Sequence, residues 1–198
     1  MGTGASIEAW QSQTGSRGKA MSSNIIKSLR KFTGRVIAVD IETVTLPNGH
    51  QFDLEVIQHP GGSAVVALND QGQVCLLRQY RHVAGQWLWE LPAGKIDPGE
   101  SPSSTAKREL AEEAGVHAAK WRELGMVYTS PGVFKEVIHL YLAEELSATD
   151  IQHETEELIE IQWLELSTAL EWARSGQIID AKTLLGLYHA VRLVDPDQ

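Results

Sequence analysis

The sequence predicts a mixed α/β fold, and three features lead to this prediction. Most of the chain consists of short runs of β-branched and apolar residues separated by Gly, Pro, Asn and Asp, which is typical of strands joined by turns. A few longer stretches carry helical start and stop signals. Strands and helices do not alternate regularly, so a mixed sheet is favoured over a regular βαβ series. The 198 residues are enough for one domain with a core and a small extension.

The first 60 residues contain a polar tail and then a predicted hairpin. Residues 1–23 are rich in Gly, Ser, Thr and Gln and have no apolar period, which predicts a flexible tail. Strands are expected from Lys31 onward, and Asn48-Gly49 is suited to the positive φ of a hairpin turn. Residues 24–60 are therefore predicted to form a small N-terminal antiparallel β extension. Its expected strands are residues 35–41 and 52–57, joined by a turn at 46–49.

The larger part of the chain begins at residue 61, after a break at His59-Pro60-Gly61-Gly62. A helix is expected at 101–114, because Ser101 is suited to cap its start, Pro102 fits the first turn, and Gly115 can end it. The other expected helices are residues 168–175 and 181–193. The expected strands are residues 63–68, 73–78, 87–91, 123–128, 137–142 and 158–166.

Composition and charge exclude several classes of function. The net charge of −9 repels nucleic-acid backbones, so no nucleic-acid partner is expected. No apolar run approaches the roughly 20 residues of a membrane span, so no membrane partner is expected either. The single cysteine, Cys75, lies in an apolar run without a partner, which favours a buried hydrophobic role and a cytoplasmic location. The histidines lack the spacing of zinc ligands.

The predicted central helix carries three carboxylates close together. Glu109 and Glu113 are one turn apart, and Glu112 lies beside them. Like charges at this spacing destabilise a helix, and Arg108 neutralises only part of the charge. An exposed acidic helix face is one interpretation. The other is a magnesium site, since Mg²⁺ takes carboxylate oxygens and keeps positions for water and phosphate.

The whole segment favours the metal interpretation. Residues 94–116 match the pattern Gly-x5-Glu-x7-Arg-Glu-apolar-x-Glu-Glu-x-Gly-apolar at each of its nine defined positions, which chance produces in fewer than roughly one chain in a million. The sequence therefore resembles the Nudix family, whose signature box has this form. The resemblance implies an α/β/α sandwich around a mixed sheet, with residues 61–198 as the hydrolase domain.

The resemblance also implies roles for residues of the box. Glu109 and Glu113 would be the main metal ligands, with Glu112 assisting in catalysis and the Ala93 carbonyl as a further ligand. Arg108 would orient the glutamates, and Glu100 would pair with it. The implied cofactor is Mg²⁺, with Mn²⁺ as a substitute.

Features outside the box are similar to the subgroup that cleaves ADP-ribose and nucleotide sugars. Ser130-Pro131-Gly132 with Glu136 resembles a substrate loop of that subgroup, although Ser-Pro-Gly alone is only a turn signal. Arg81 and Lys182 resemble residues that contact substrate, and surface cations are the alternative for both. Residues 24–60 resemble the small sheet through which the subgroup forms homodimers.

The late acidic run at residues 153–160 is the expected source of a general base. Solvated charge is the usual meaning of such a run. In the resembling subgroup a carboxylate here closes over the metals, as base or as additional ligand. Glu157 is the favoured residue, and Glu156, Glu154 and the Glu136 of the Ser-Pro-Gly loop remain alternatives.

These observations predict a function. The chain is expected to hydrolyse, with Mg²⁺, the pyrophosphate bond of a nucleoside diphosphate sugar such as ADP-ribose or GDP-mannose. The products would be a nucleoside monophosphate and a sugar phosphate. Pyrophosphohydrolysis of nucleoside triphosphates or of RNA 5′ ends is an alternative, and a non-catalytic nucleotide sensor is an alternative of another class.

Overall fold

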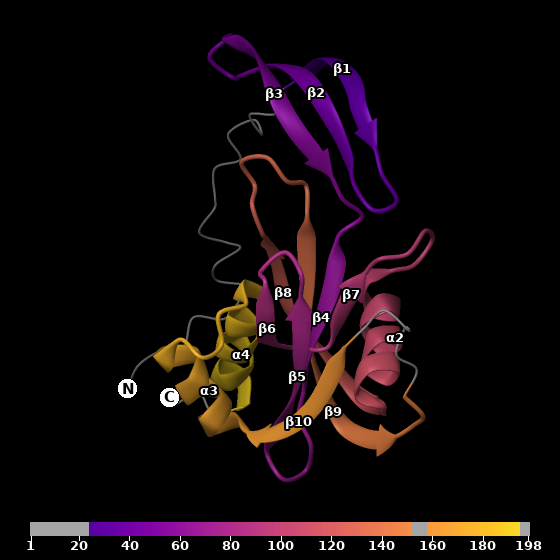
Figure 1. Cartoon of the computed structure of the whole chain (residues 1–198), viewed down its shortest axis with the longest axis vertical. Coiled ribbons are helices and arrows are strands. Elements are labelled where there is room, and N and C mark those ends of the chain that lie inside the picture. The colour runs from indigo at the N-terminus through magenta and orange to yellow at the C-terminus, as the bar shows by residue number, and fades with distance from the viewer. Residues whose placement is uncertain (1–23, 152–157, 195–198) are drawn as a thin grey trace, which may run out of the picture.

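The structure is a computed structural model, and it describes residues 24–151 and 158–194. Figure 1 shows a small sheet standing above a larger body of strands and helices. The predicted tail at 1–23 and the favoured base Glu157 lie outside the described residues, as do Glu154 and Glu156.

The small sheet is antiparallel, with strand order β1-β2-β3. It consists of β1 (Asn24–Thr33), β2 (Ala38–Thr45) and β3 (Gln51–Gln58). The predicted hairpin is therefore confirmed, with Gly49 at φ 85° in its turn.

The start of this sheet differs from the prediction. β1 precedes the first expected strand, and it was missed because all of its residues are exposed and give no burial pattern. Residues 35–37 were expected in a strand but lie in the connection from β1 to β2. The Gly34 N–H donates to the Ile37 carbonyl at 2.8 Å and closes a turn there, against the strand preference of Val36.

The larger body contains two further sheets. One is mixed, with order β7-β4-β9-β8, and its central β4 and β9 are parallel. The other is antiparallel, with order β10-β5-β6. The strands of the mixed sheet are β4 (Gly62–Ala67), β7 (Ala93–Lys95), β8 (Val116–Tyr128) and β9 (Val137–Ala148). Those of the antiparallel sheet are β5 (Gln73–Arg81), β6 (Gln86–Glu90) and β10 (Ile159–Glu165).

Helices cover both sides of the strands, as an α/β/α sandwich requires. They are α2 (Pro102–Ala114), α3 (Leu166–Ser175) and α4 (Ala181–Val194), and Figure 1 shows α2 on the opposite side from α3 and α4. Every residue of β4 is buried. Val65 and Ala67 pack into the core beneath α2, while Ala64 and Val66 pack into the core with α3 and α4. Alternate side chains of one strand thus fill both cores.

The helix that carries the box has the predicted ends. The Ser101 side chain accepts a hydrogen bond from the Ser104 N–H at 3.1 Å, which caps the first turn. Gly115 ends the helix at φ 65°, and its N–H donates to the Ala111 carbonyl. The short strand β7 was not predicted, because Ala-Gly-Lys has little strand propensity; its pairing with β4 creates it.

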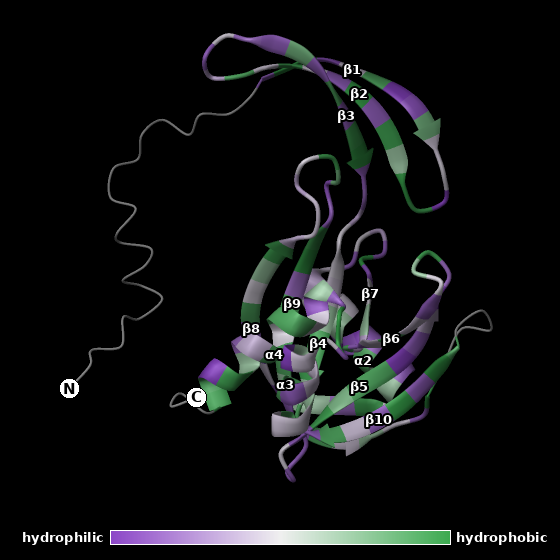
Figure 2. Cartoon of the chain, turned by 60° about the vertical axis from the view of Figure 1, so that its left-hand side comes forward, coloured by the Kyte–Doolittle hydropathy of each residue, from purple (hydrophilic) through white to green (hydrophobic). Residues whose placement is uncertain are grey.

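The hydropathy pattern is visible in Figure 2, where hydrophobic and hydrophilic residues alternate along the small sheet. Within the described parts of the chain, no helix has the length and apolar character needed to cross a membrane.

Candidate active site

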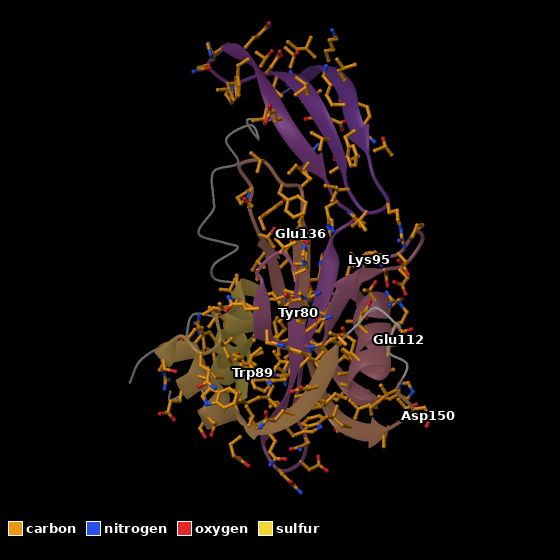
Figure 3. The ribbon with its side chains drawn as sticks, viewed as in Figure 1. Tyr80, Trp89, Lys95, Glu112, Glu136 and Asp150 are labelled. Atoms are coloured by element: carbon orange, nitrogen blue, oxygen red, sulfur yellow. The ribbon has the colours of Figure 1, made fainter. Side chains whose placement is uncertain are left out.

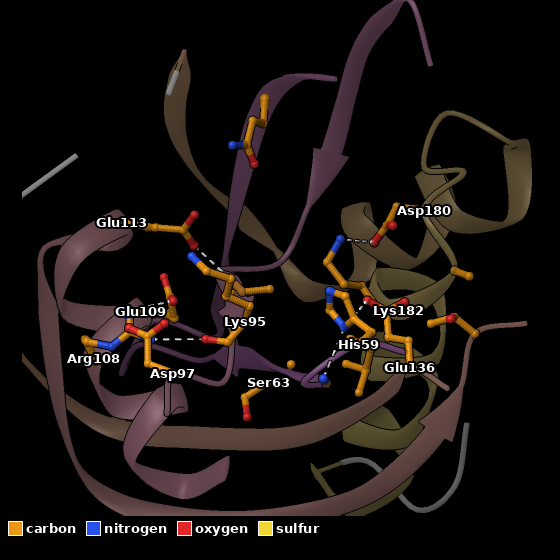
Figure 4. Close-up of a pocket in the computed structure, with 18 of the residues that line it drawn as sticks. His59, Ser63, Lys95, Asp97, Arg108, Glu109, Glu113, Glu136, Asp180 and Lys182 are labelled. Atoms are coloured by element: carbon orange, nitrogen blue, oxygen red, sulfur yellow. Dashed lines mark hydrogen bonds and ion pairs between the residues drawn. The ribbon is translucent and has the colours of Figure 1, made fainter. Parts of the chain in front are cut away.

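A cavity of about 500 Å³ opens between α2 and the start of α4. Figure 4 shows the glutamates of α2 on one side, with His59, Glu136 and Lys182 on the other. The cavity brings together most of the predicted site residues, namely Arg81, Ala93, Arg108, Glu109, Glu112, Glu113, Glu136 and Lys182.

Arg108 connects the carboxylates of the box. Its guanidinium contacts Glu109 at 2.6 Å and Glu112 at 3.0 Å through Nη1. Its Nε donates to Glu100 at 2.9 Å, so the expected pairing of Glu100 with Arg108 is present. Hydrogen bonds from Arg108 and then from Thr105 lower the pKa of Glu100 to about 2. The arginine therefore supplies counter-charge to three carboxylates at once.

The two inner glutamates are held close to β7. Glu109 is 9% exposed and Glu113 is 3% exposed. The Ala93 N–H donates to Glu113 Oε2 at 2.7 Å. A Cβ added to Gly94 would lie 1.9 Å from a carboxylate oxygen of Glu109. Only glycine allows this approach of β7 to the glutamate, which explains the first residue of the box.

The oxygen donors on the α2 side of the cavity are of the type that binds a divalent cation. Glu109, Glu112 and Glu113 supply carboxylate oxygens from one helix face, next to the backbone of Ala93. Among residues 24–151 and 158–194, no three His, Cys, Asp or Glu side chains already converge as a metal-binding group. Two of the carboxylates turn to Arg108 instead. The Glu109 carboxylate occupies the place that a Cβ of residue 94 would take, so Gly94 lets this oxygen donor lie directly against the backbone of β7.

A buried acid, Glu90 at the end of β6, holds two cations at the cavity wall. Arg81 donates to it twice, at 2.7 and 2.9 Å, and Lys182 also bonds to it. Burial raises the pKa of Glu90, but the hydrogen bond from Arg81 and the charges of Lys182 and Arg81 outweigh burial and lower the pKa to about 2. Glu90 was not predicted as a site residue. A signal was present, because a carboxylate between apolar residues, as in Trp-Glu-Leu, is seldom buried unless it has a partner.

The position of Lys182 depends on the start of α4. The sequence predicted that this helix begins at residue 181. The Asp180 carboxylate accepts hydrogen bonds from the Thr183 N–H at 3.0 Å and from its hydroxyl at 2.6 Å. The Leu91 N–H donates to the Thr183 hydroxyl oxygen at 2.9 Å, which ties the helix to the segment after β6. Lys182 Nζ lies 3.1 Å from Asp180.

The Ser-Pro-Gly loop connects β8 to β9 and contributes one predicted residue to the cavity. Glu136 lines it, and Figure 3 shows this residue between the small sheet and the larger body. Pro131 was predicted to bind substrate but does not line this cavity. It lies in a second groove of about 270 Å³ between the loop and the small sheet. The loop is drawn there by backbone pairing, with the Ile57 N–H donating to the Val133 carbonyl at 2.7 Å.

Comparisons with known proteins agree with this fold. A model of the NUDIX domain matches residues 58–184. The ADP-ribose pyrophosphatase of Bacillus subtilis is 38% identical over 173 residues, which cover 86% of this chain and 94% of that protein. The GDP-mannose pyrophosphatase of Cronobacter sakazakii is 36% identical over 148 residues, which cover 68% and 75% respectively.

A solved structure described as an ADP compounds hydrolase has a TM-score of 0.76 at 20% identity and covers 90% of this chain and 97% of its own, so the two share a fold. The chain therefore belongs to the Nudix family, and it is an enzyme of the Nudix pyrophosphatase class.

Proposed function

We propose that the protein hydrolyses, with Mg²⁺, the pyrophosphate bond of a nucleoside diphosphate sugar such as ADP-ribose or GDP-mannose. The products are a nucleoside monophosphate and a sugar phosphate. One observation carries this proposal: a single cavity has buried glutamates on one wall and two cations held by Glu90 on the other. The negative charge of a diphosphate is bound both by metal ions, which carboxylates hold, and by cationic side chains in direct contact with it. The names of the two relatives support the choice of substrate.

The acidic wall holds the metal in this proposal. Glu109, Glu113 and the Ala93 carbonyl would be its ligands, Glu112 would assist, and Mn²⁺ would substitute for Mg²⁺. A cation held there would offset the negative charge that develops on the diphosphate during hydrolysis. Arg108 orients Glu109 and Glu112 through the contacts that it already makes with both carboxylates.

The other residues bind the substrate and accept a proton. Arg81 and Lys182 contact diphosphate oxygens, and Glu90 keeps both side chains aimed at the same place. Glu157, which the structure does not describe, is the proposed general base toward the attacking water. Glu136 is the alternative base, because it lines the same cavity.

We also propose that the protein is a cytoplasmic homodimer formed through residues 24–60, and that it binds neither nucleic acid nor membranes. The exposed apolar residues of β1 support the dimer. The net charge of −9 argues against nucleic acid, and the lone buried Cys75 supports a reducing compartment.

The proposal is tested by turnover of a substrate panel with product identification. The panel is ADP-ribose, GDP-mannose, a nucleoside triphosphate and a triphosphorylated RNA, each with and without Mg²⁺. We expect the diphosphate sugars to yield a monophosphate and a sugar phosphate only when Mg²⁺ is present. Preference for the triphosphate or the RNA would overturn the substrate class.

Matched variants test whether the glutamates of α2 act as metal ligands. Glu109→Gln and Glu113→Gln remove one ligand charge each, and we expect kcat to fall by on the order of 10³. Folding should survive, because each change relieves repulsion on α2. Glu171→Gln, an exposed residue of α3, is the control and should keep wild-type turnover. Equal turnover in all variants would refute the assignment of Glu109 and Glu113 as metal ligands.

A further inference from the structure

His59 follows β3 directly, and its ring lies in the wall of the cavity (Figure 4). Its side chain is 11% exposed, and the function proposed above gives it no role. Its Nδ1 accepts a hydrogen bond from the Gly61 N–H at 3.1 Å. A ring nitrogen that accepts a hydrogen bond carries no proton, so the neutral ring carries its proton on Nε2.

The Nε2–H of His59 is directed into the cavity. It makes no hydrogen bond within the described part of the chain, where this ring makes its contacts through Nδ1 and with the Phe134 ring. In the same part of the chain, no buried side-chain nitrogen or oxygen lacks a partner. Nε2 is therefore accessible, and the opening that this ring borders is the cavity. His59 thus presents an N–H donor there.

A carboxylate lines the same cavity and lies next to Nδ1, the ring nitrogen without a proton. Glu136 Oε1 lies 3.4 Å from His59 Nδ1, and the Glu136 side chain is 19% exposed at the same cavity. Phosphate oxygens at neutral pH are acceptors, and they suit the cations Arg81 and Lys182. A hydroxyl group both donates and accepts. The N–H donor of His59 and the carboxylate acceptor of Glu136, which line the same cavity, are together complementary to a hydroxyl rather than to a phosphate.

We propose that His59, together with Glu136, binds a sugar hydroxyl of the nucleoside diphosphate sugar. This inference rests on the proposed function and adds a specificity-determining residue to it. The hydroxyl belongs either to the nucleoside ribose or to the sugar beyond the diphosphate, and the chemistry of recognition is the same for both.

The small sheet positions this pair of residues. The Lys135 N–H donates to the Ile57 carbonyl at 2.9 Å, so the end of β3 runs beside the Ser-Pro-Gly loop. On the side away from the cavity, the buried Glu42 accepts hydrogen bonds from Gln58 at 3.1 Å and from Lys135 at 3.2 Å. Gln58 and Lys135 each precede a member of the pair along the chain. The contact with Glu42 therefore sets the spacing between His59 and Glu136.

Two substitutions of His59 separate hydrogen bonding to substrate from local packing. In His59→Asn, the amide oxygen can replace Nδ1 as acceptor of the Gly61 N–H, but the donor toward the cavity is lost. In His59→Gln, the longer amide places an N–H near the position of Nε2. We expect His59→Asn to lower kcat/KM for ADP-ribose about tenfold, mainly through KM, and His59→Gln to lose less. His117→Asn, on an exposed position of β8, is the control.

Three substrates identify the hydroxyl. They are ADP-ribose, the methyl ester of ADP, which lacks the second sugar, and ADP-ribose built on 2′,3′-dideoxyadenosine. A defect of His59→Asn that disappears with the methyl ester assigns the second sugar, and one that disappears with the dideoxy compound assigns the nucleoside ribose. An equal defect with all three, or a larger defect in His59→Gln, overturns the inference.

The outcome is separate from that of the proposed function. Wild-type protein that cleaves no diphosphate sugar refutes the function itself. Wild-type protein that cleaves ADP-ribose while His59→Asn is equally active refutes only the role of His59.

Discussion

Glu90 is 2% exposed, and its carboxylate binds both Arg81 and Lys182 at the cavity wall. A buried acid without partners would become protonated, because burial disfavours the charged form. Here two cations reverse that preference. The same ion pairs that place two positive charges beside the substrate site therefore also make the folded state sensitive to acid.

The pH dependence of stability follows from the pKa of Glu90, which is 4.5 for an ordinary glutamate and about 2 in the folded protein. Because folding lowers this pKa, Glu90 stabilises the folded state fully above pH 4.5, and the contribution is lost as the pH falls toward 2. Its size is on the order of 3 kcal/mol. The free-energy difference between wild type and Glu90→Gln should therefore be largest at pH 7 and shrink by pH 3.

Urea denaturation at pH 7, 5 and 3 measures this difference. Glu171→Gln, which removes an exposed acid, should show no comparable pH dependence. A difference between wild type and Glu90→Gln that stays constant over this range would contradict the assignment of the ion pairs.

The sequence predicted the roles of some site residues and not of others. Glu109, Glu112 and Glu113 were identified because their spacing on one helix is encoded locally. Glu90 and His59 were not, because their roles depend on partners 92 and 77 residues away along the chain. Pro131 was assigned to the substrate from its place in a motif. The pairing of its loop with β3, which no local pattern encodes, directs it to another groove.

At the level of elements, the approach of β7 to α2 shapes the acidic wall. β7 pairs with β4 through Ser63 and Gly94, and α2 packs on the same strand. The Gly94 backbone therefore stands directly against the Glu109 carboxylate. The pairing with β4 explains why a three-residue strand with poor strand propensity forms where it does.

Gly94→Ala tests this approach. Its Cβ would meet the Glu109 carboxylate at 1.9 Å, so either the strand or the glutamate must move. We expect a loss of about 1–3 kcal/mol in the free energy of unfolding, as for other overpacked sites. We also expect kcat to fall by about 10²-fold, because a small displacement of a catalytic group has large effects.

Gly132→Ala is the matched control, since a Cβ at that position meets nothing within 4 Å. Thermal unfolding and steady-state kinetics on both variants give the measurement. Gly94→Ala with the stability and the kcat of Gly132→Ala would show that the wall does not depend on this contact.

The helices and strands that have clear local sequence signals were predicted more accurately than those that lack them. α2 was predicted because Ser101 and Gly115 are residue types that typically cap the start and the end of a helix. α3 and α4 were also predicted, within two residues at each end. β8 begins earlier and β9 ends later than predicted, because their outer halves pair with each other where the chain is exposed and shows little apolar alternation.

At the scale of the whole molecule, the small sheet has two different faces. One face carries Asp40, Glu42 and Val44, which are buried. The cross-strand pairs Leu29–Ile41 and Phe32–Val39 lie on the opposite face. Leu29 is 45% exposed and Phe32 is 53% exposed in the single chain. The inner face thus has its partner within the chain, whereas the outer face presents apolar side chains to solvent.

A second copy of the chain is the partner that we expect for this outer face, because closed two-fold dimers are the commonest soluble assemblies. The double variant Leu29→Lys, Phe32→Lys places two charges on the face without touching the buried carboxylates of the inner face. We expect it to be monomeric by light scattering, while the wild type is a dimer. Its kcat/KM for ADP-ribose should fall, because the sheet that positions His59 loses support, and its unfolding should remain cooperative.

The control for this experiment is Val83→Lys. Val83 is 102% exposed in the turn between β5 and β6, so the variant also adds a charge at an exposed apolar position, but away from the small sheet. It should remain a dimer with wild-type activity. A wild-type protein that is monomeric and fully active would refute the dimer. A dimeric double variant would mean that the two copies meet elsewhere, since lysine pairs facing one another across a two-fold axis repel and are costly to bury.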